Sequence, residues 1–383
     1  MRGAAMRVIF TVTGILKESA GTTYTVPALC SGLVRNGVEV QLHTLGAVRE
    51  GRHEYPVFTY KRHRFPLWAL GRSPEMLHGL LDVAQDCDII HNNGIWMLPN
   101  VYPAIVKRNS RCKLVFCPHG GLSAVALKRS RLKKFMMGHF GGQYMALRAT
   151  DMFHAASIKE LEEIRALGYR QPVAMVPNGI DVPEISHKPF GGSKRKLVFL
   201  GRIHATKAVG NLVDAWGNVQ SRFPEWSLEI AGPDCGDVSR IKEIISRREI
   251  PRVKFVGEFH GKRKYEFVAG ADLYVLPSLT ENFGITIAEA LACGTPVIAS
   301  RGCPWSRLGE KKCGWWIDVG ADALTEMLET ALSARPAALA EMGANGRRWM
   351  ESEFSWDIMA KRMLASYSWL LGKGDKPEFV YVD

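Results

Sequence analysis

Short apolar and β-branched runs alternate along most of the chain with stretches in which apolar residues recur every three or four positions. The short runs are typical of buried strands, and the longer period is typical of helices with one buried face. The first half has strand patterns at Arg7–Val12, Val38–Thr44, Ile89–His91, Lys113–Pro118, Met152–Ala155 and Val173–Val176. The second half has them at Lys196–Gly201, Ser227–Ala231, Val253–Val256, Leu273–Leu276, Pro296–Ala299 and Gly314–Ile317. This alternation predicts an α/β fold with a doubly wound sheet of about six strands in each half.

The length of the chain and one irregular segment predict two domains. A chain of 383 residues is longer than a single hydrophobic core usually serves. Asp181–Lys196 is rich in proline, glycine and charge and interrupts the periodic pattern, as linkers do. After Pro336 the pattern is helical to about Leu371. We expect domains at 1–185 and 186–354, a final helical segment at 355–383, and a ligand at the carboxyl ends of the strands.

Cysteine spacing, the first residues and the net charge restrict the class of protein. None of the eight cysteines forms a Cys-x-x-Cys pair, which predicts reduced thiols rather than disulfides or a zinc site. The opening residues, MRGAAMRVIF, lack the apolar core of a signal peptide, and no apolar stretch approaches the roughly 20 residues of a membrane-spanning helix. We therefore expect a cytoplasmic protein, either free or peripheral at the inner face of the cell membrane. The net charge of +12 favours nucleotides, phospholipid surfaces or nucleic acid as partners and does not choose among them.

The segment SLTENFGITIAEALACGTPVIAS, from Ser278 to Ser300, carries two glutamates around a predicted helix start. Glu281 lies in the loop after a buried strand, Phe283-Gly284 opens the helix, and Glu289 lies in its second turn. Each carboxylate can accept two hydrogen bonds from a pair of vicinal hydroxyls, and the free N–H groups of a helix start attract phosphate. An isolated glutamate pair is more often a solvent-facing helix start, but the strand, loop, glycine and helix in sequence favour a ligand site.

Three further loops each follow a predicted strand. Arg202 and Lys207 follow the strand that ends at Gly201, and two cations beside a helix start suit a diphosphate, although alone they are equally compatible with a surface charge pair. His119 precedes two glycines; a lone histidine is usually structural, but in a loop of this kind it can polarise a substrate hydroxyl. Gly21 precedes a helix and offers backbone N–H groups to an anion, although the loop is not the GxGxxG of nicotinamide-binding proteins.

At these four places, in this order, the chain resembles the family 4 retaining glycosyltransferases of the GT-B fold, of the bacterial polysaccharide and lipopolysaccharide type. The similarity runs nearly end to end and includes PHGGLSAVALKRSRLKK, VPNGIDVP, FVGEF, ADLYVLPSLTENFGITIAEALACGTPVIAS and FSWDIMAKRM. The resemblance implies two Rossmann-like domains with a cleft between them, a donor bound mainly by the second domain, and a final helix that crosses back to the first.

The resemblance also implies a role for each motif residue. Glu289 would bind the ribose hydroxyls of the donor, and Glu281 with the backbone of Asn282, Phe283 and Gly284 would bind the sugar hydroxyls. Arg202 and Lys207, with an N–H of Gly21, would bind the diphosphate. His119 would lie near the transferred sugar, and Glu258 and Phe259 would border the nucleobase. Two positions depart from the family pattern: Ala20 stands where a second glycine is usual, and Ala208 follows Lys207 where glycine is usual.

The implied activity is metal-independent transfer of a hexose with retention, from a UDP-sugar or else a GDP-sugar, to a lipid-linked or polysaccharide acceptor in surface glycan biosynthesis. No cofactor is expected, because Arg202, Lys207 and helix-start amides supply positive charge to the leaving phosphate. A nucleotide-sugar epimerase of the same fold and a non-catalytic nucleotide-sugar-binding scaffold are the alternatives. A nucleic-acid-binding protein ranks last, because no module signature is present.

Two basic segments in the first half are candidates for acceptor binding. Leu127–Arg148 combines lysines and arginines with Phe135-Met136-Met137, which suits an anionic membrane surface or a lipid diphosphate as well as an ordinary basic helix with one core face. Arg52–Met76 is basic and aromatic and is expected to form an acceptor loop.

Overall fold

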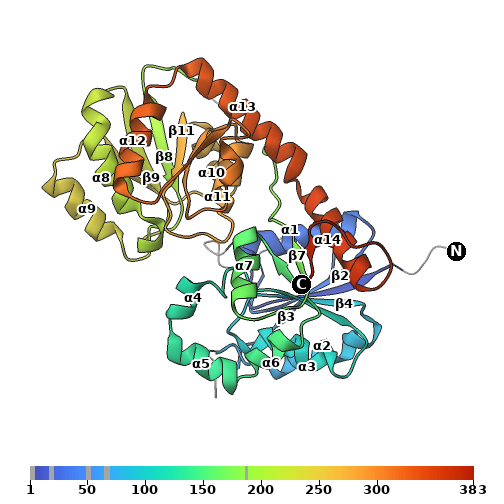
Figure 1. The fold of residues 1–383 in the computed structure, drawn as a ribbon. Coiled ribbons are helices and arrows are strands. Elements are labelled where there is room, and N and C mark those ends of the chain that lie inside the picture. The colour runs from blue at the N-terminus through green and yellow to red at the C-terminus, as the bar shows by residue number, and fades with distance from the viewer. Residues whose placement is uncertain (1–4, 17–20, 49–52, 64–69, 186–188) are drawn as a thin grey trace. The chain divides into compact units, whose positions relative to one another are not determined.

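The structure, a computed structural model, describes residues 5–16, 21–48, 53–63, 70–185 and 189–383. Ala20, residues 186–188 of the expected linker, and Arg52 and residues 64–69 of the expected acceptor loop lie outside the described residues. The chain divides into two units: Met1–Gly179 together with Trp356–Asp383, and Ile180–Ser355 (Figure 1). Each unit contains one sheet and its own helices.

The first unit contains an eight-stranded sheet in the order β14-β7-β6-β5-β4-β1-β2-β3. Its strands are β1 (Arg7–Val12), β2 (Glu39–Leu45), β3 (Val57–Tyr60), β4 (Ile89–Asn93), β5 (Lys113–Cys117), β6 (Met152–Ala155), β7 (Val173–Met175) and β14 (Val380–Tyr381). All neighbours pair in parallel except β14, which runs antiparallel to β7.

Two of these strands correct the expectation of about six. β3 pairs with β2, so part of the segment Arg52–Met76, expected to be an acceptor loop, is an edge strand. The last residues of that segment begin helix α2 (Pro74–Val83). β14 has only two residues and is added at the opposite edge by the end of the chain. The other six strands of this unit lie where the pattern predicts them, within one or two residues.

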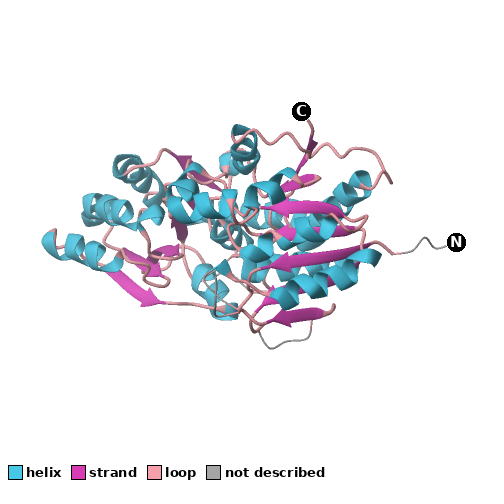
Figure 2. Cartoon of the chain, turned by 90° about the horizontal axis from the view of Figure 1, so that it is seen from below, coloured by secondary structure: helices cyan, strands magenta, loops and turns pink. Residues whose placement is uncertain are grey.

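The helices of the first unit cover both faces of its sheet (Figure 2). They are α1 (Thr22–Arg35), α2 (Pro74–Val83), α3 (Tyr102–Lys107), α4 (Ala124–Lys128), α5 (Arg131–His139), α6 (Gln143–Arg148), α7 (Ile158–Ala166) and α14 (Trp356–Leu370). Because strand side chains alternate, Phe10 of β1 packs with α1 and α14, whereas Ile9 packs with α2 and α3 on the other face. The crossing of α1 and α14 requires Gly32, since a Cβ there would lie 2.9 Å from the Cβ of Ala360.

The second unit contains a six-stranded parallel sheet in the order β10-β9-β8-β11-β12-β13. Its strands are β8 (Arg195–Leu200), β9 (Trp226–Ala231), β10 (Val253–Gly257), β11 (Leu273–Leu276), β12 (Val297–Ser300) and β13 (Gly314–Ile317). Its helices are α8 (Val209–Val219), α9 (Val238–Arg247), α10 (Gly261–Ala269), α11 (Ile285–Ala292), α12 (Ala321–Leu332) and α13 (Pro336–Glu353). Both sheets are doubly wound, which confirms the predicted fold class.

Candidate functional site

The second unit has a topological switch point between β8 and β11. From β8 the chain proceeds to β9 and β10 on one side of the sheet, and β11, β12 and β13 extend the other side. In open parallel sheets, ligands bind at the carboxyl ends of the strands where the order reverses. The loop after β8 carries Arg202 and Lys207, and the loop after β11 carries Glu281. The topology therefore brings together the two loops that the sequence motifs single out.

Backbone contacts fix these two loops against each other and against the loop after β12. Leu279 N donates to Thr206 O at 2.8 Å, and Glu281 N donates to Gly302 O at 2.8 Å. Gly302 is required for this approach, because a Cβ there would lie 2.2 Å from Ser278 O. Glu281 is thus carried by a loop that is held on both sides.

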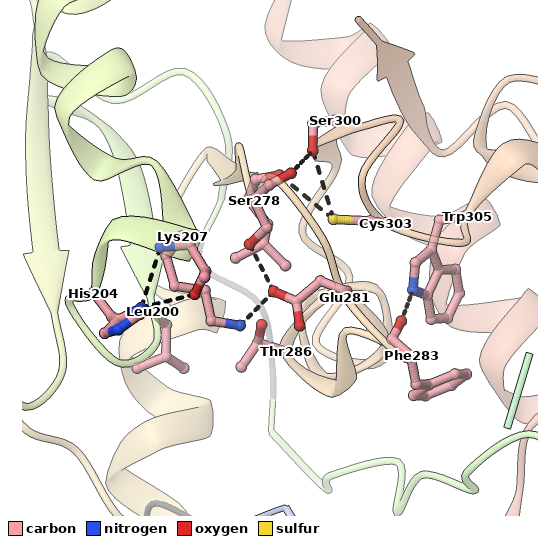
Figure 3. A network of polar contacts seen from close by, with 12 residues as sticks. Leu200, His204, Lys207, Ser278, Glu281, Phe283, Thr286, Ser300, Cys303 and Trp305 are labelled. Atoms are coloured by element: carbon pink, nitrogen blue, oxygen red, sulfur yellow. Dashed lines mark hydrogen bonds and ion pairs between the residues drawn. The ribbon is translucent and has the colours of Figure 1, made fainter. Parts of the chain in front are cut away.

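Lys207 and Glu281 form an ion pair (Figure 3). The same carboxylate oxygen, Oε1, accepts a hydrogen bond of 2.6 Å from Ser278 Oγ. The two charged side chains are only 16% and 12% exposed, so the pair is largely withdrawn from water. The resemblance assigns Lys207 to a diphosphate and Glu281 to a sugar. The structure places the two side chains together and adds Ser278, to which the motif analysis gave no role.

Glu289 lies in the second turn of α11, as predicted, and is buried. Its Oε1 is 2.5 Å from Nζ of Lys264 on α10. Among the described residues, its Oε2 has no hydrogen-bond partner although it is buried. Burial raises the pKa of the Glu289 carboxyl, and the nearby Lys264 opposes that rise. Lys264 is a site residue that the motif analysis missed.

The three residues before α11 contribute in different ways. Asn282 has a buried Oδ1 without a hydrogen-bond partner among the described residues. Phe283 packs its ring against Trp305, with ring centroids 5.2 Å apart, and its carbonyl accepts a 2.6 Å bond from Trp305 Nε1. Gly284 adopts φ +79° at the start of the helix, a conformation that favours glycine. The side chain of Phe283 therefore belongs to the core, so only its backbone N–H is available to a ligand.

The remaining predicted residues of the second unit are more exposed. Arg202 is exposed, and no carboxylate in the described part of the chain pairs with it. Glu258 and Phe259 follow β10, which is separated from β8 by β9. Glu258 is exposed and lies 3.5 Å from Nε2 of His260, whereas Phe259 stacks on Phe267 with ring centroids 4.6 Å apart.

In the first unit, a pocket lies at the carboxyl ends of the strands. Its lining includes Thr25, Asn93, His119, His154 and Trp356. His119 Nε2 is 3.0 Å from Asn93 Oδ1, and the amide nitrogen of Asn93 donates to His91 O. Because Oδ1 only accepts, the proton of His119 is on Nε2, and Nδ1 is left as an acceptor. Burial lowers the pKa of His119 to about 3, so the ring is neutral near pH 7.

The loop of His119 is held by a second residue that the motif analysis missed. Glu160 on α7 accepts hydrogen bonds from Gly120 N at 2.6 Å and from Ala156 N at 2.8 Å. The signal for this role is in the sequence: Ser157 and Glu160 have the spacing of a capping box, and Ser157 Oγ accepts from Glu160 N. Gly21 is the residue before α1, and Thr25, which donates its N–H to Gly21 O, lines the pocket.

Among the residues that the structure describes, no group of three or more His, Cys, Asp or Glu side chains is placed to hold a metal ion. The chain has one Asp-x-Asp triplet, Asp86-Cys87-Asp88, just before β4. Asp88 accepts from Arg7 N at 2.8 Å there, at the end of the sheet opposite to the pocket. All eight cysteines are free in the structure.

Comparisons with known proteins define first the class and then the family. The structure matches sucrose-phosphate synthase from Thermosynechococcus elongatus with a TM-score of 0.77 and 19% identity, over 96% of this chain and 100% of that one. It matches Anabaena HepE in complex with UDP and glucose with a TM-score of 0.74 and 18% identity, over 95% of this chain and 99% of that one. The fold is the GT-B fold of glycosyltransferases.

Two family models match adjoining parts of the chain. The model described as Glycosyltransferase Family 4 matches residues 20–184, and that of Glycosyl transferases group 1 matches residues 183–349. The GDP-mannose-dependent monoacylated alpha-(1-6)-phosphatidylinositol monomannoside mannosyltransferase of Corynebacterium glutamicum is 25% identical over 82% of this chain and 86% of its own length. The chain belongs to the family 4 glycosyltransferases.

Proposed function

We propose that this glycosyltransferase moves a hexose, with retention and without a metal, from a UDP- or GDP-sugar to a lipid-linked or polysaccharide acceptor. The observation that carries the donor assignment is a pair of buried acceptors, Glu289 Oε2 and Asn282 Oδ1, which have no donor among the described residues. A buried acceptor without a partner costs about 1–3 kcal/mol, so a ligand rich in hydroxyl donors stabilises both. Glu289 binds the ribose hydroxyls, and Asn282 binds hydroxyls of the transferred sugar.

The cations of the loop after β8 supply the charge that the reaction needs. As the bond from sugar C1 to the phosphate oxygen breaks, positive charge develops on the sugar and negative charge on the leaving diphosphate. Arg202 and Lys207 stabilise the diphosphate, and Lys207 exchanges Glu281 for phosphate when the donor binds. The acceptor hydroxyl attacks C1 from the face that the diphosphate leaves, and the leaving phosphate oxygen takes the hydroxyl proton, so configuration is retained.

The two kinds of comparison support both candidate bases of the donor. The relative from Corynebacterium glutamicum is named as GDP-mannose-dependent, and the matched structure of HepE holds UDP. The same relative acts on a phosphatidylinositol monomannoside, as its name states, which supports a lipid-linked acceptor for this chain.

A calorimetric screen of UDP, GDP and their hexose conjugates tests the donor assignment. A ligand at 100 times its dissociation constant also adds about 2.7 kcal/mol to stability, which a thermal shift detects. We expect Glu289→Gln to weaken the free diphosphate and the intact donor alike by about tenfold to a hundredfold. Glu281→Gln should leave the free diphosphate unweakened and lower transfer. Equal losses in both variants, or none in Glu289→Gln, contradict the assignment.

Product analysis after incubation with the same nucleotide sugars separates the alternatives. A non-catalytic scaffold binds a nucleotide sugar without releasing its diphosphate, even with water as acceptor over long incubation. A nucleotide-sugar epimerase changes the sugar of the donor pool at C2 or C4 without an added acceptor. Release of UDP or GDP that accelerates with a lipid-linked sugar supports transfer.

We further propose that α4 and α5 bring the enzyme to the cytoplasmic face of an anionic membrane, where a lipid-linked acceptor resides. Residues 124–140 contain five lysines and arginines and no acidic residue. Large apolar side chains of this segment are exposed: Leu132 and Phe140 by 76%, Phe135 by 51% and Met136 by 48%. Exposed apolar side chains among cations suit insertion at an anionic interface. In the described part of the chain, none of the helices is long and apolar enough to cross a bilayer.

Vesicle sedimentation tests this surface. The Leu132→Ser/Phe140→Ser double variant should lose binding to phosphatidylglycerol vesicles while keeping its diphosphate affinity, because neither residue belongs to a loop assigned to the donor. Unchanged sedimentation, or equal binding to neutral vesicles, contradicts the proposal.

A further inference from the structure

A lysine outside every sequence motif contacts the buried glutamate of the donor site. Lys264 is on α10, and its Nζ lies 2.5 Å from Oε1 of Glu289 on α11. The side chains are 17% and 8% exposed, so water screens this pair poorly. The ammonium also lies 4.8 Å from the ring centroid of Tyr265, which further restricts its position.

The other titratable groups next to Glu289 are a tyrosine and a cysteine that carry no charge near neutral pH, and the nearby arginine faces the cysteine. Tyr274 on β11 has its pKa raised well above the ordinary value, by burial first and by Glu289 among the neighbours. Cys293, directly after α11, has its pKa raised to about 12, again mainly by burial. Arg347 on α13 faces Cys293 and donates to Ala292 O at 3.0 Å. The cation bonded directly to Glu289 is that of Lys264.

We propose that Lys264 is a positioning residue for donor binding: it holds Glu289 as a carboxylate and occupies Oε1, so that Oε2 presents its two lone pairs to the ribose diol. The role rests on the proposed assignment of Glu289 to the ribose.

The chemistry of the carboxyl explains why such a lysine is needed. Burial disfavours the charged form of Glu289, as its raised pKa reflects. A protonated carboxyl carries an O–H donor where a diol requires an acceptor. A cation at contact distance opposes protonation, and its fixed place on one oxygen determines which oxygen is left for the ligand. Without Lys264 the site should remain folded but should bind the diol only at higher pH.

The affinity of UDP and GDP between pH 6 and pH 8.5 tests this role in Lys264→Met, Lys264→Arg and the wild type. Dividing each variant affinity by that of the wild type at the same pH removes the titration of the ligand phosphates. One linked proton changes affinity by up to tenfold per pH unit. We expect Lys264→Met to bind about tenfold or more weakly than the wild type at pH 6, with the ratio shrinking to about threefold at pH 8.5. Lys264→Arg, which keeps the cation, should stay within about threefold throughout.

A matched control is available in the same unit. Lys196 on β8 lies 3.0 Å from Oε1 of Glu229 on β9, a buried glutamate whose lysine partner, like itself, lies within a strand rather than in the loops at the carboxyl ends. Lys196→Met should leave the ratio at one across the pH range. If Lys264→Met does not fold, Lys264→Gln carries the same test, because it also removes the charge.

The outcomes distinguish this role from the function on which it rests. A wild type that binds neither UDP nor GDP overturns the nucleotide assignment itself. A wild type that binds one of them, with a Lys264→Met ratio that is constant from pH 6 to pH 8.5 or equal to one, overturns only the role of Lys264. A constant loss of that kind is what a merely structural contact would produce.

Discussion

Lys207→Met tests separately the observed ion pair of this lysine with Glu281 and its proposed contact with a diphosphate. The substitution removes the ammonium and retains an unbranched side chain that fills similar space. It breaks the ion pair with Glu281, whose Oε1 keeps the 2.6 Å hydrogen bond from Ser278 Oγ. The carboxylate therefore loses a charge partner but is not left without a donor.

The structure sets different magnitudes for stability and for catalysis. Both side chains are less than one-fifth exposed, at 16% and 12%, so loss of one partner should cost about 1–3 kcal/mol of unfolding free energy, toward the lower end because Ser278 remains. Loss of one preorganised charge-stabilising donor typically lowers turnover by about 10²- to 10³-fold. The catalytic loss should thus be far larger than a small decrease in the folded fraction explains.

Urea unfolding and turnover at saturating donor, measured on the same preparation, check this prediction. Lys311→Met is a matched control, because it removes an ion pair with Glu353 at 2.5 Å in the same unit outside the loops after β8 and β11. That pair is 27% and 30% exposed and Glu353 keeps Arg307, so the control should lose at most about 1 kcal/mol and keep its turnover. Wild-type turnover in a folded Lys207→Met protein would refute the diphosphate role.

Three other predictions follow from the described contacts. Activity should persist in excess EDTA, because side-chain cations rather than a metal are proposed to stabilise the diphosphate; loss in EDTA with recovery on adding Mg²⁺ contradicts this. Gly302→Ala should lower both stability and donor affinity, since its Cβ would lie 2.2 Å from Ser278 O in the loop that carries Glu281; calorimetry and urea melts that match the wild type refute the point. Stability should fall as the pH drops from about 6.5 toward 4. Burial lowers the pKa of His43 and His154 to about 4 and that of His119 to about 3. In this pH range the unfolded chain therefore takes up protons that the folded chain does not. A urea midpoint that is equal at pH 7 and pH 5 contradicts the last prediction.

Most of the strands that the sequence pattern predicted are buried on both faces of a sheet, although β10, an edge strand without a buried position, was predicted as well. In β1 and β8 nearly every position is buried, so the apolar run is continuous and its length identifies a strand. β3 has no buried position, and its four residues lie between basic and aromatic neighbours, so the pattern around it indicates a loop. Its strand character depends on pairing with β2, which is a tertiary contact. β14 is two residues long and depends in the same way on β7.

Some residues of the candidate site were also predictable from the sequence, whereas others depend on tertiary contacts. The loops that carry Arg202, Lys207 and Glu281 were predictable because each follows a strand directly, and parallel strands bring such loops to one edge. The proximity of Lys264 to Glu289 was not predictable from spacing. Lys264 belongs to the run GKRKYE, in which Lys262 pairs instead with Glu266 on the helix surface. Only the packing of α10 on α11 determines which of these cations reaches the buried carboxylate.

Each glutamate of the motif is paired with a lysine that the other does not share: Glu281 with Lys207 and Glu289 with Lys264. Both carboxylates are nearly buried, and a buried charge is tolerated only when it is paired. The two pairs nevertheless differ in what donor binding demands of them. The proposed roles require Lys207 to leave Glu281 for the diphosphate, whereas Lys264 has to remain on Glu289 for Oε2 to face the ribose. The Lys207 pair is therefore an internal competitor of the donor and the Lys264 pair a support for it. Removing the glutamate charge should accordingly have opposite effects on diphosphate affinity at the two positions, unchanged or tighter in Glu281→Gln and weaker in Glu289→Gln.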